Sequence, residues 1–169
     1  MPKLFAVYLG GRAPKCNTEL HDVVFVVGES IEATYSQLTE LWFGSREGLH
    51  IDSWLELSVI DGHTVTLTKT PSNTAKKLFF VNLGAYAAQQ FTEIHANAFM
   101  VGADALSVKQ RAKATLLTGA HKIHTDNLFE VDDCLQIDSA HGWFVHLEPT
   151  HQPDVWQPVN DYHIIPYSL

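Results

Sequence analysis

The chain has 169 residues, 46% of them hydrophobic, and a formal net charge of −8 from 11 Lys and Arg against 19 Asp and Glu. The apolar fraction is typical of a packed globular core, and an acidic chain without any basic run argues against a nucleic-acid partner. No apolar segment approaches the roughly 20 residues of a membrane-spanning helix, and no cleavage pattern of a signal peptide follows the short apolar run near the start. We therefore expect a cytoplasmic protein without nucleic-acid or membrane partners.

The sequence repeats itself at an offset of 74 residues. Residues 3–28 read KLFAVYLGGRAPKCNTELHDVVFVVG, and residues 77–102 read KLFFVNLGAYAAQQFTEIHANAFMVG, identical at about half of the positions. Unrelated segments would agree at far fewer positions, so the repeat predicts a tandem duplication. The same offset, without a gap, aligns His50 with His124 and Asp52 with Asp126.

In the first copy, the apolar pattern predicts strands at 4–9, 23–27, 54–60 and 64–68, separated by glycine-containing or polar segments. A helix is expected between the second and third strands. Ser30 is the expected N-cap residue, because its hydroxyl can accept a hydrogen bond from an unpaired backbone N–H. Apolar residues follow near helical spacing, and Gly44 suits the end of the helix. A polar loop is expected to run to His50 and Asp52.

The second copy predicts the same order, with strands at 78–83, 98–101, 128–131 with 135–137, and 143–147. Its helix is expected to begin at Asp104 and end near Gly119. The fold class expected from both copies is α+β, a tandem duplication of a ββαββ unit that is β-grasp-like, with antiparallel or mixed sheets. The expected boundaries are 1–69 for the first repeat, 70–76 for a linker, 77–148 for the second repeat and 149–169 for a C-terminal extension.

The C-terminal extension lies outside the repeat and contains four prolines, which disfavour a helix. Its Trp156 and the apolar segment 162–165 predict packing on the repeats, or an added edge strand on a second subunit. A unit of about 70 residues is marginal by itself, which favours a shared core or an oligomer. We therefore expect self-association.

Four pairs of an acid and a histidine stand out because both copies contain them. They are Glu19 with His21, His50 with Asp52, Glu93 with His95, and His124 with Asp126. In a strand, residues two apart point to the same face, so each pair brings an imidazole and a carboxylate together. Such pairs suit a divalent metal site or an acid–base pair, although neither spacing matches an established zinc motif. The four histidines are the candidate metal ligands, and no residue is assigned as catalytic.

The expected strand order separates the pairs within one copy. If the second and third strands lie at opposite edges of the sheet, three strand spacings place them roughly 14 Å apart. That distance is too long for one metal ion. A site between the two copies is therefore expected, with Glu-x-His of one copy facing His-x-Asp of the other.

Three interpretations remain open for these pairs. Polar residues at strand entrances often satisfy the backbone of a loop, which is a purely structural role. In a second interpretation, the chain is a binding or interaction protein with a ligand site between the repeats. In a third, it is a small metal-dependent hydrolase with Glu19 or Glu93 as the base.

The motifs LFAVYLGG, TELHDVVFVVG, LWFG and HIDSW resemble the bacterial family called domain of unknown function 1543 (DUF1543), whose members carry one or two copies. The resemblance covers about residues 3–68 and, with more divergence, 77–148. In the second copy Gly11 is replaced by Ala85 and Asp22 by Ala96. The resemblance implies a bacterial protein with two tandem copies, and it implies no particular reaction.

Overall fold

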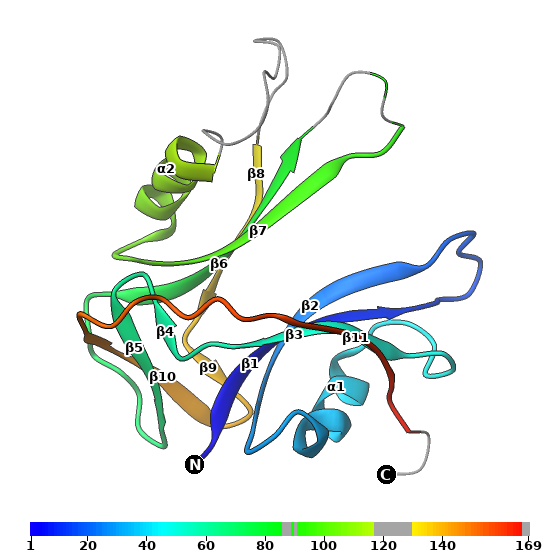
Figure 1. Cartoon of the computed structure of the whole chain (residues 1–169), viewed down its shortest axis with the longest axis horizontal. Helices are drawn as coiled ribbons and strands as arrows, with labels where there is room; N and C mark the ends of the chain where they lie inside the picture. The colour runs from blue at the N-terminus through cyan, green and yellow to red at the C-terminus, as the bar shows by residue number, and fades with distance from the viewer. Residues whose placement is uncertain (86–88, 90, 117–129, 167–169) are drawn as a thin grey trace.

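The computed structural model describes residues 1–85, 89, 91–116 and 130–166, and within them it shows an α+β fold of three antiparallel sheets and two α-helices (Figure 1). The first sheet has the order β11-β3-β1-β2, so the first strand of the chain lies between the second and third. Its strands are β1 (Lys3–Gly11), β2 (Leu20–Gly28), β3 (His50–Glu56) and β11 (Val159–Ile164).

The second copy builds a sheet of the same order, β7-β6-β8. Its strands are β6 (Lys77–Ala85), β7 (Ile94–Gly102) and β8 (Glu130–Ile137). The helix α2 (Ala105–Leu116) connects β7 to β8, as η1 (Glu32–Thr34) and α1 (Tyr35–Leu41) connect β2 to β3. In both copies the first strand is therefore central, and the strands on either side of it are antiparallel to it.

The third sheet contains strands from both copies, in the order β4-β5-β10-β9. Its strands are β4 (Val59–Ile60), β5 (His63–Thr68), β10 (Trp143–Pro149) and β9 (Ser139–Ala140). The closing strand of each copy pairs with the other copy, β5 against β10, instead of returning to its own sheet. The β-grasp order is thus not confirmed, because no strand lies between β1 and β3.

Successive side chains of β1 and β6 point to opposite faces of their sheets, so the two faces of each strand pack against different parts of the protein. Phe5, Val7 and Leu9 pack with residues of α1, while Phe79, Val81 and Leu83 pack with Val108 and Ala112 of α2. The alternate residues belong to the core between the copies, which includes Leu4, Ala6, Leu78 and Phe80. Each sheet is therefore covered by a helix on one face and by the other copy on the opposite face.

The expected helix start at Asp104 is confirmed, because Asp104 Oδ1 accepts the Ser107 N–H at 2.7 Å directly before α2. The start expected at Ser30 is one residue too early, since Ile31 is the N-cap of η1 and α1 begins at Tyr35. Ser30 Oγ still accepts the Ala33 N–H at 3.4 Å. The end predicted at Gly44 is wrong, since α1 ends at Leu41. A Cβ on Gly44 would lie 2.5 Å from the backbone oxygen of Arg12, so close packing of two loops explains this glycine. The end predicted at Gly119 lies outside the described residues.

The third strand begins earlier than predicted. His50 and Asp52 lie within β3 itself, because β1 and β11 pair with this segment on both sides. In the second copy, Glu130 lies opposite Gly84 as His50 lies opposite Gly10. The ungapped alignment of His50 with His124 is therefore wrong at this point, because the second copy is already longer before β8 begins. His124 and Asp126 lie outside the described residues.

The C-terminal extension returns to the first copy. Strand β11 pairs with β3, the Val155 N–H donates to the Val59 oxygen at 3.0 Å, and Ile165 is buried in the core under α1. Trp156 also reaches the second copy, with its ring centroid 6.1 Å from that of Phe99. None of the helices in the described ranges is long and apolar enough to cross a membrane.

Candidate functional site

Two of the predicted pairs meet on the first sheet. The His50 Nε2 lies 3.2 Å from a Glu19 oxygen and 3.4 Å from an Asp52 oxygen. The His21 Nε2 lies 3.6 Å from the other Glu19 oxygen and 3.4 Å from the other Asp52 oxygen. We call Glu19, His21, His50 and Asp52 the His-carboxylate cluster.

The sheet order explains why these side chains meet within one copy. Gly10 of β1 pairs with His21 on one side and with His50 on the other, so two strand spacings separate the histidines and not three. Gly10 has no side chain, and a Cβ there would collide with His50 Nε2 and Asp52 Oδ2. The expectation of roughly 14 Å and of a pairing between copies is therefore wrong for Glu19, His21, His50 and Asp52.

The His50 imidazole forms the floor of the cluster, with 1% of the side chain exposed. Its Nδ1 lies 2.7 Å from the Gly48 carbonyl oxygen, which can only accept, so Nδ1 carries a proton. In the neutral ring, Nε2 then presents its lone pair to the carboxylates. His50 Nε2 and Asp52 Oδ2 are both buried without a hydrogen-bond partner. The ring of Tyr162 from β11 covers His50, with ring centroids 4.2 Å apart.

The opposite side of the cluster is accessible to solvent. The side chains of His21, Glu19 and Asp52 are 35%, 44% and 29% exposed. The His21 ring stacks on Tyr8 at a centroid distance of 5.1 Å. Burial and, to a lesser degree, the Asp52 carboxylate raise the pKa of Tyr8 above its ordinary value, so this phenol stays protonated.

The cluster in its present arrangement does not enclose an ion. Across the described ranges, no group of three or more His, Cys, Asp or Glu side chains is placed so that it could hold a metal. The cluster atoms stand at ion-pair distances from one another, and Glu19 and His21 have room to turn because they are partly exposed.

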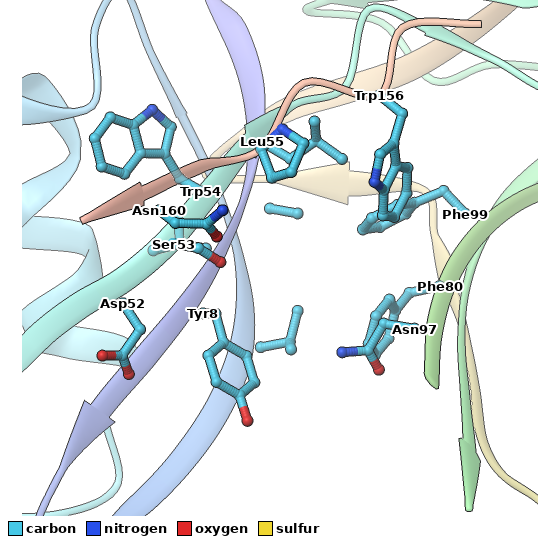
Figure 2. Close-up of a pocket in the computed structure, with 14 residues that line it drawn as sticks. Tyr8, Asp52, Ser53, Trp54, Leu55, Phe80, Asn97, Phe99, Trp156 and Asn160 are labelled. Carbon is cyan, nitrogen blue, oxygen red and sulfur yellow. The ribbon is translucent and has the colours of Figure 1, made fainter. Parts of the chain in front are cut away.

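A cleft of about 390 Å³ lies beside the cluster, between the two copies. Figure 2 shows Tyr8, Asp52 and Ser53 of the first sheet on one side and Phe80, Phe99 and Asn97 of the second copy on the other. Trp156 of the C-terminal extension closes one end next to Phe99. The first-sheet wall also contains Val7, Trp54 and Leu55, so the cleft is largely apolar and carries a few polar groups, including those of Tyr8, Asp52 and Ser53.

A second hollow of about 360 Å³ lies next to the cleft, between the β1–β2 hairpin of the first copy and strands β6, β7 and β8 of the second. It shares Tyr8, Val23, Phe80 and Asn97 with the first and is also lined by His21 and His95. Asp52 lines the first hollow and His21 lines the second. The His-carboxylate cluster therefore borders both hollows on the side of the first sheet.

The corresponding pair of the second copy is arranged differently. His95 Nε2 lies 3.6 Å from a Glu93 oxygen, and His95 Nδ1 lies 3.1 Å from the Asn82 amide oxygen. Asn82 stands at the position of Tyr8 in the first copy, and Glu130 has the register position of His50. The two copies therefore do not carry equivalent sites.

Some residues of the site could not be identified from the sequence pattern. The sequence does not show that Gly10 lies under the cluster, and Tyr162 lies far from the cluster in sequence. Tyr8 differs between the copies, so the duplication does not mark it. Only the repeated acid and histidine pairs pointed to this region.

Residues 16–67 and 90–140 each match the family described as Domain of Unknown Function (DUF1543). These two segments make up more than half of the chain. The chain belongs to the DUF1543 family. The two matches confirm that this DUF1543 protein carries two tandem copies.

A solved structure supports the same assignment. The DUF1543 chain is similar to the crystal structure of a protein Il1583 from Idiomarina loihiensis, with 34% sequence identity and a TM-score of 0.79. The similarity covers 99% of this chain and 100% of the other. Among curated proteins, no relative matches. The fold is thus shared over the full length of both chains.

Proposed function

We propose that this DUF1543 protein binds a small molecule in the cleft between its two copies. The supporting observation is the cleft itself, because about 390 Å³ lies within the size range of ligand pockets, roughly 300–1,000 Å³. Both copies and the C-terminal extension contribute to its walls. A ligand site in this cleft would therefore depend on the packing of the two copies and the C-terminal extension against one another.

The walls of the cleft indicate the chemistry of the ligand. Phe80, Phe99 and Trp156 offer ring faces and edges to a flat apolar group. On the other side, the Asp52 carboxylate and the Tyr8 hydroxyl can accept hydrogen bonds. The ligand that suits both walls is a small molecule with a flat ring and a positively charged or hydrogen-bond-donating group.

Filling the cleft tests this proposal. Ser53→Trp places an indole in the cleft, whereas Ser139→Trp adds the same side chain on strand β9, outside the residues that line it. The neutral fluorescent probe N-phenyl-1-naphthylamine should bind the wild type saturably. Its affinity should fall by about tenfold or more in Ser53→Trp and stay unchanged in Ser139→Trp, since lost aromatic contact and lost volume weaken binding.

Two outcomes would contradict the proposal that the cleft binds a small molecule. One is a wild-type protein that does not enhance the fluorescence of the probe. The other is equal binding by both tryptophan variants, provided that thermal melting shows both to be folded.

We also propose that both copies derive from one ββαββ unit, with boundaries at 1–69 and 77–148, a linker at 70–76 and an extension at 149–169. The common order of the two sheets, with the first strand in the centre, supports a common unit. The exchange of β5 and β10 between the copies would then be a later feature of the packing.

A metal-dependent hydrolase is the second candidate function. The observation that favours it is the His-carboxylate cluster at the side of the cleft, where a metal ion could polarise a substrate that joins its coordination shell. This alternative requires metal binding at the cluster, so a titration with Co²⁺ that shows no binding there would also rule out the hydrolase.

A further inference from the structure

We propose that the His-carboxylate cluster binds one divalent transition-metal ion, with Zn²⁺ as the representative. The ligands are His21 Nε2, His50 Nε2 and the carboxylates of Glu19 and Asp52. Two imidazole nitrogens and two carboxylates are a donor set that suits zinc and similar ions. The two negative charges also balance the charge of a divalent cation.

The distances within the cluster agree with this donor set. Zinc bonds to imidazole nitrogen and carboxylate oxygen measure about 2.0–2.2 Å, so ligand atoms at the corners of a tetrahedron stand about 3.3–3.6 Å apart. The four nitrogen–oxygen distances of the cluster are 3.6, 3.4, 3.2 and 3.4 Å, and they join the two Nε2 atoms to both oxygens of Glu19 and both oxygens of Asp52. These atoms do not enclose one point in the present arrangement. Binding of an ion therefore requires side chains of the cluster to turn, and Glu19 and His21 are partly exposed.

The orientation of the His50 ring is the second argument. Its Nδ1 donates to the Gly48 carbonyl oxygen at 2.7 Å, so Nε2 is directed into the cluster, 3.2 and 3.4 Å from oxygens of Glu19 and Asp52. This buried Nε2 has no hydrogen-bond partner, which leaves it available to a cation. A histidine that donates its other ring N–H to a backbone carbonyl is the usual arrangement of a metal ligand.

The third argument is the space above Gly10. Even one methyl group at this position would collide with His50 Nε2 and Asp52 Oδ2, so glycine leaves the room that both atoms occupy above the strand. The Tyr162 ring fixes the His50 imidazole from the other side. The least exposed ligand of the proposed site is therefore held before the ion binds.

The proposal assigns one ion to each chain and not two. In the second copy Glu130 has the register position of His50, so no histidine occupies that place in the described part of its sheet. His95 lies beside Glu93 and Asn82, and it is not one of the proposed ligands.

Titration of the chelator-treated protein with Co²⁺ tests the site, because tetrahedral Co²⁺ with such ligands absorbs visible light. The expected result is saturation at one ion per chain, reversed by Zn²⁺. His21→Gln and Asp52→Asn should each weaken the affinity by about tenfold or more, since each removes a ligand. His95→Gln and the exposed His151→Gln are the matched controls and should leave the affinity and the stoichiometry unchanged.

The proposal is overturned if the wild type gives no visible spectrum and no thermal stabilisation at millimolar Co²⁺ or Zn²⁺. It is equally overturned if His21→Gln and Asp52→Asn bind as the wild type does, or if only a control variant loses binding. Thermal melting without metal shows whether each variant is folded. The naphthylamine assay is independent of metal, so a failure of the metal site leaves the ligand cleft to be judged separately.

Discussion

Gly10 shows how one residue without a side chain creates the site. It lies between His21 and His50 in the register of the sheet, and atoms of His50 and Asp52 occupy the space where its Cβ would be. The sequence placed glycine here in both copies, but a glycine at the end of an apolar run indicates a strand end as readily as a close approach. Only the sheet order shows which side chains occupy the space above it.

We expect Gly10→Ala to lower the free energy of unfolding by about 1–3 kcal/mol, because the added Cβ forces buried atoms of His50 and Asp52 to move. Urea unfolding at pH 7 measures this change, and NMR should show altered imidazole resonances of His50.

Gly142→Ala is the control for a general effect of losing glycine. Gly142 has a φ of 73° and no atom within 4 Å of an added Cβ, so the expected loss of about 1–2 kcal/mol is purely conformational. The His50 resonances should not change in this variant. A Gly10→Ala protein with wild-type stability and wild-type imidazole resonances would show that Gly10 does not maintain the cluster.

Among the secondary-structure elements, the strands were predicted better than the helices. The apolar runs at 4–9 and 78–83 predict the central strands β1 and β6, and the structure shows that both faces of these strands are buried. The helix of the first copy is shorter than its apolar spacing indicated, because Trp42 adopts an extended conformation and its indole N–H donates to the Ser45 oxygen at 3.0 Å. Side chains that pack in a following loop can have the same spacing as those of a helix.

We expect Asp104→Ala to destabilise α2 more than Ser30→Ala destabilises the first helix at pH 7. The Asp104 carboxylate accepts the Ser107 N–H at 2.7 Å, whereas the Ser30 hydroxyl makes a longer bond of 3.4 Å. Thermal melting of both variants, followed by circular dichroism, compares the two helix starts.

The loss of stability in Asp104→Ala should depend on pH. The backbone N–H and then the hydroxyl of Ser107 hold the pKa of Asp104 below its ordinary value of 3.8. The contribution of this cap is therefore complete above pH 3.8 and decreases as the pH falls through the lowered pKa. The difference between Asp104→Ala and the wild type should shrink in acid, and a difference that grows in acid would contradict the assignment.

At the scale of the whole molecule, the two copies are joined by more than apolar contact. Asp61, in the turn before β5, accepts the Val101 N–H at 2.8 Å and pairs with the Arg111 guanidinium of the second copy. Asp154 of the extension accepts the N–H groups of Asp61 and Gly62 at 2.9 and 3.0 Å. The extension therefore supports the same turn that connects the copies.

We expect removal of residues 150–169 to leave the mass of the protein in solution unchanged apart from the missing segment, because β11 pairs with β3 of its own chain. The midpoint of thermal unfolding should fall, since β3 loses its edge partner and Ile165 leaves the core. Light scattering after size-exclusion chromatography measures the mass. A dimer that becomes a monomer on truncation would instead show that the extension joins two subunits.

The sequence by itself determined the duplication, the α+β class, the apolar central strands and the acid and histidine pairs, because each is a local or periodic property of the residues. Only the tertiary structure decided that β5 pairs with β10 and that the partners of Glu19 and His21 are His50 and Asp52. It also decided where the cleft between the copies lies. The physical reason is that strand partners and the space between side chains depend on long-range packing. Residues far apart in the chain specify that packing together, and no segment specifies it alone.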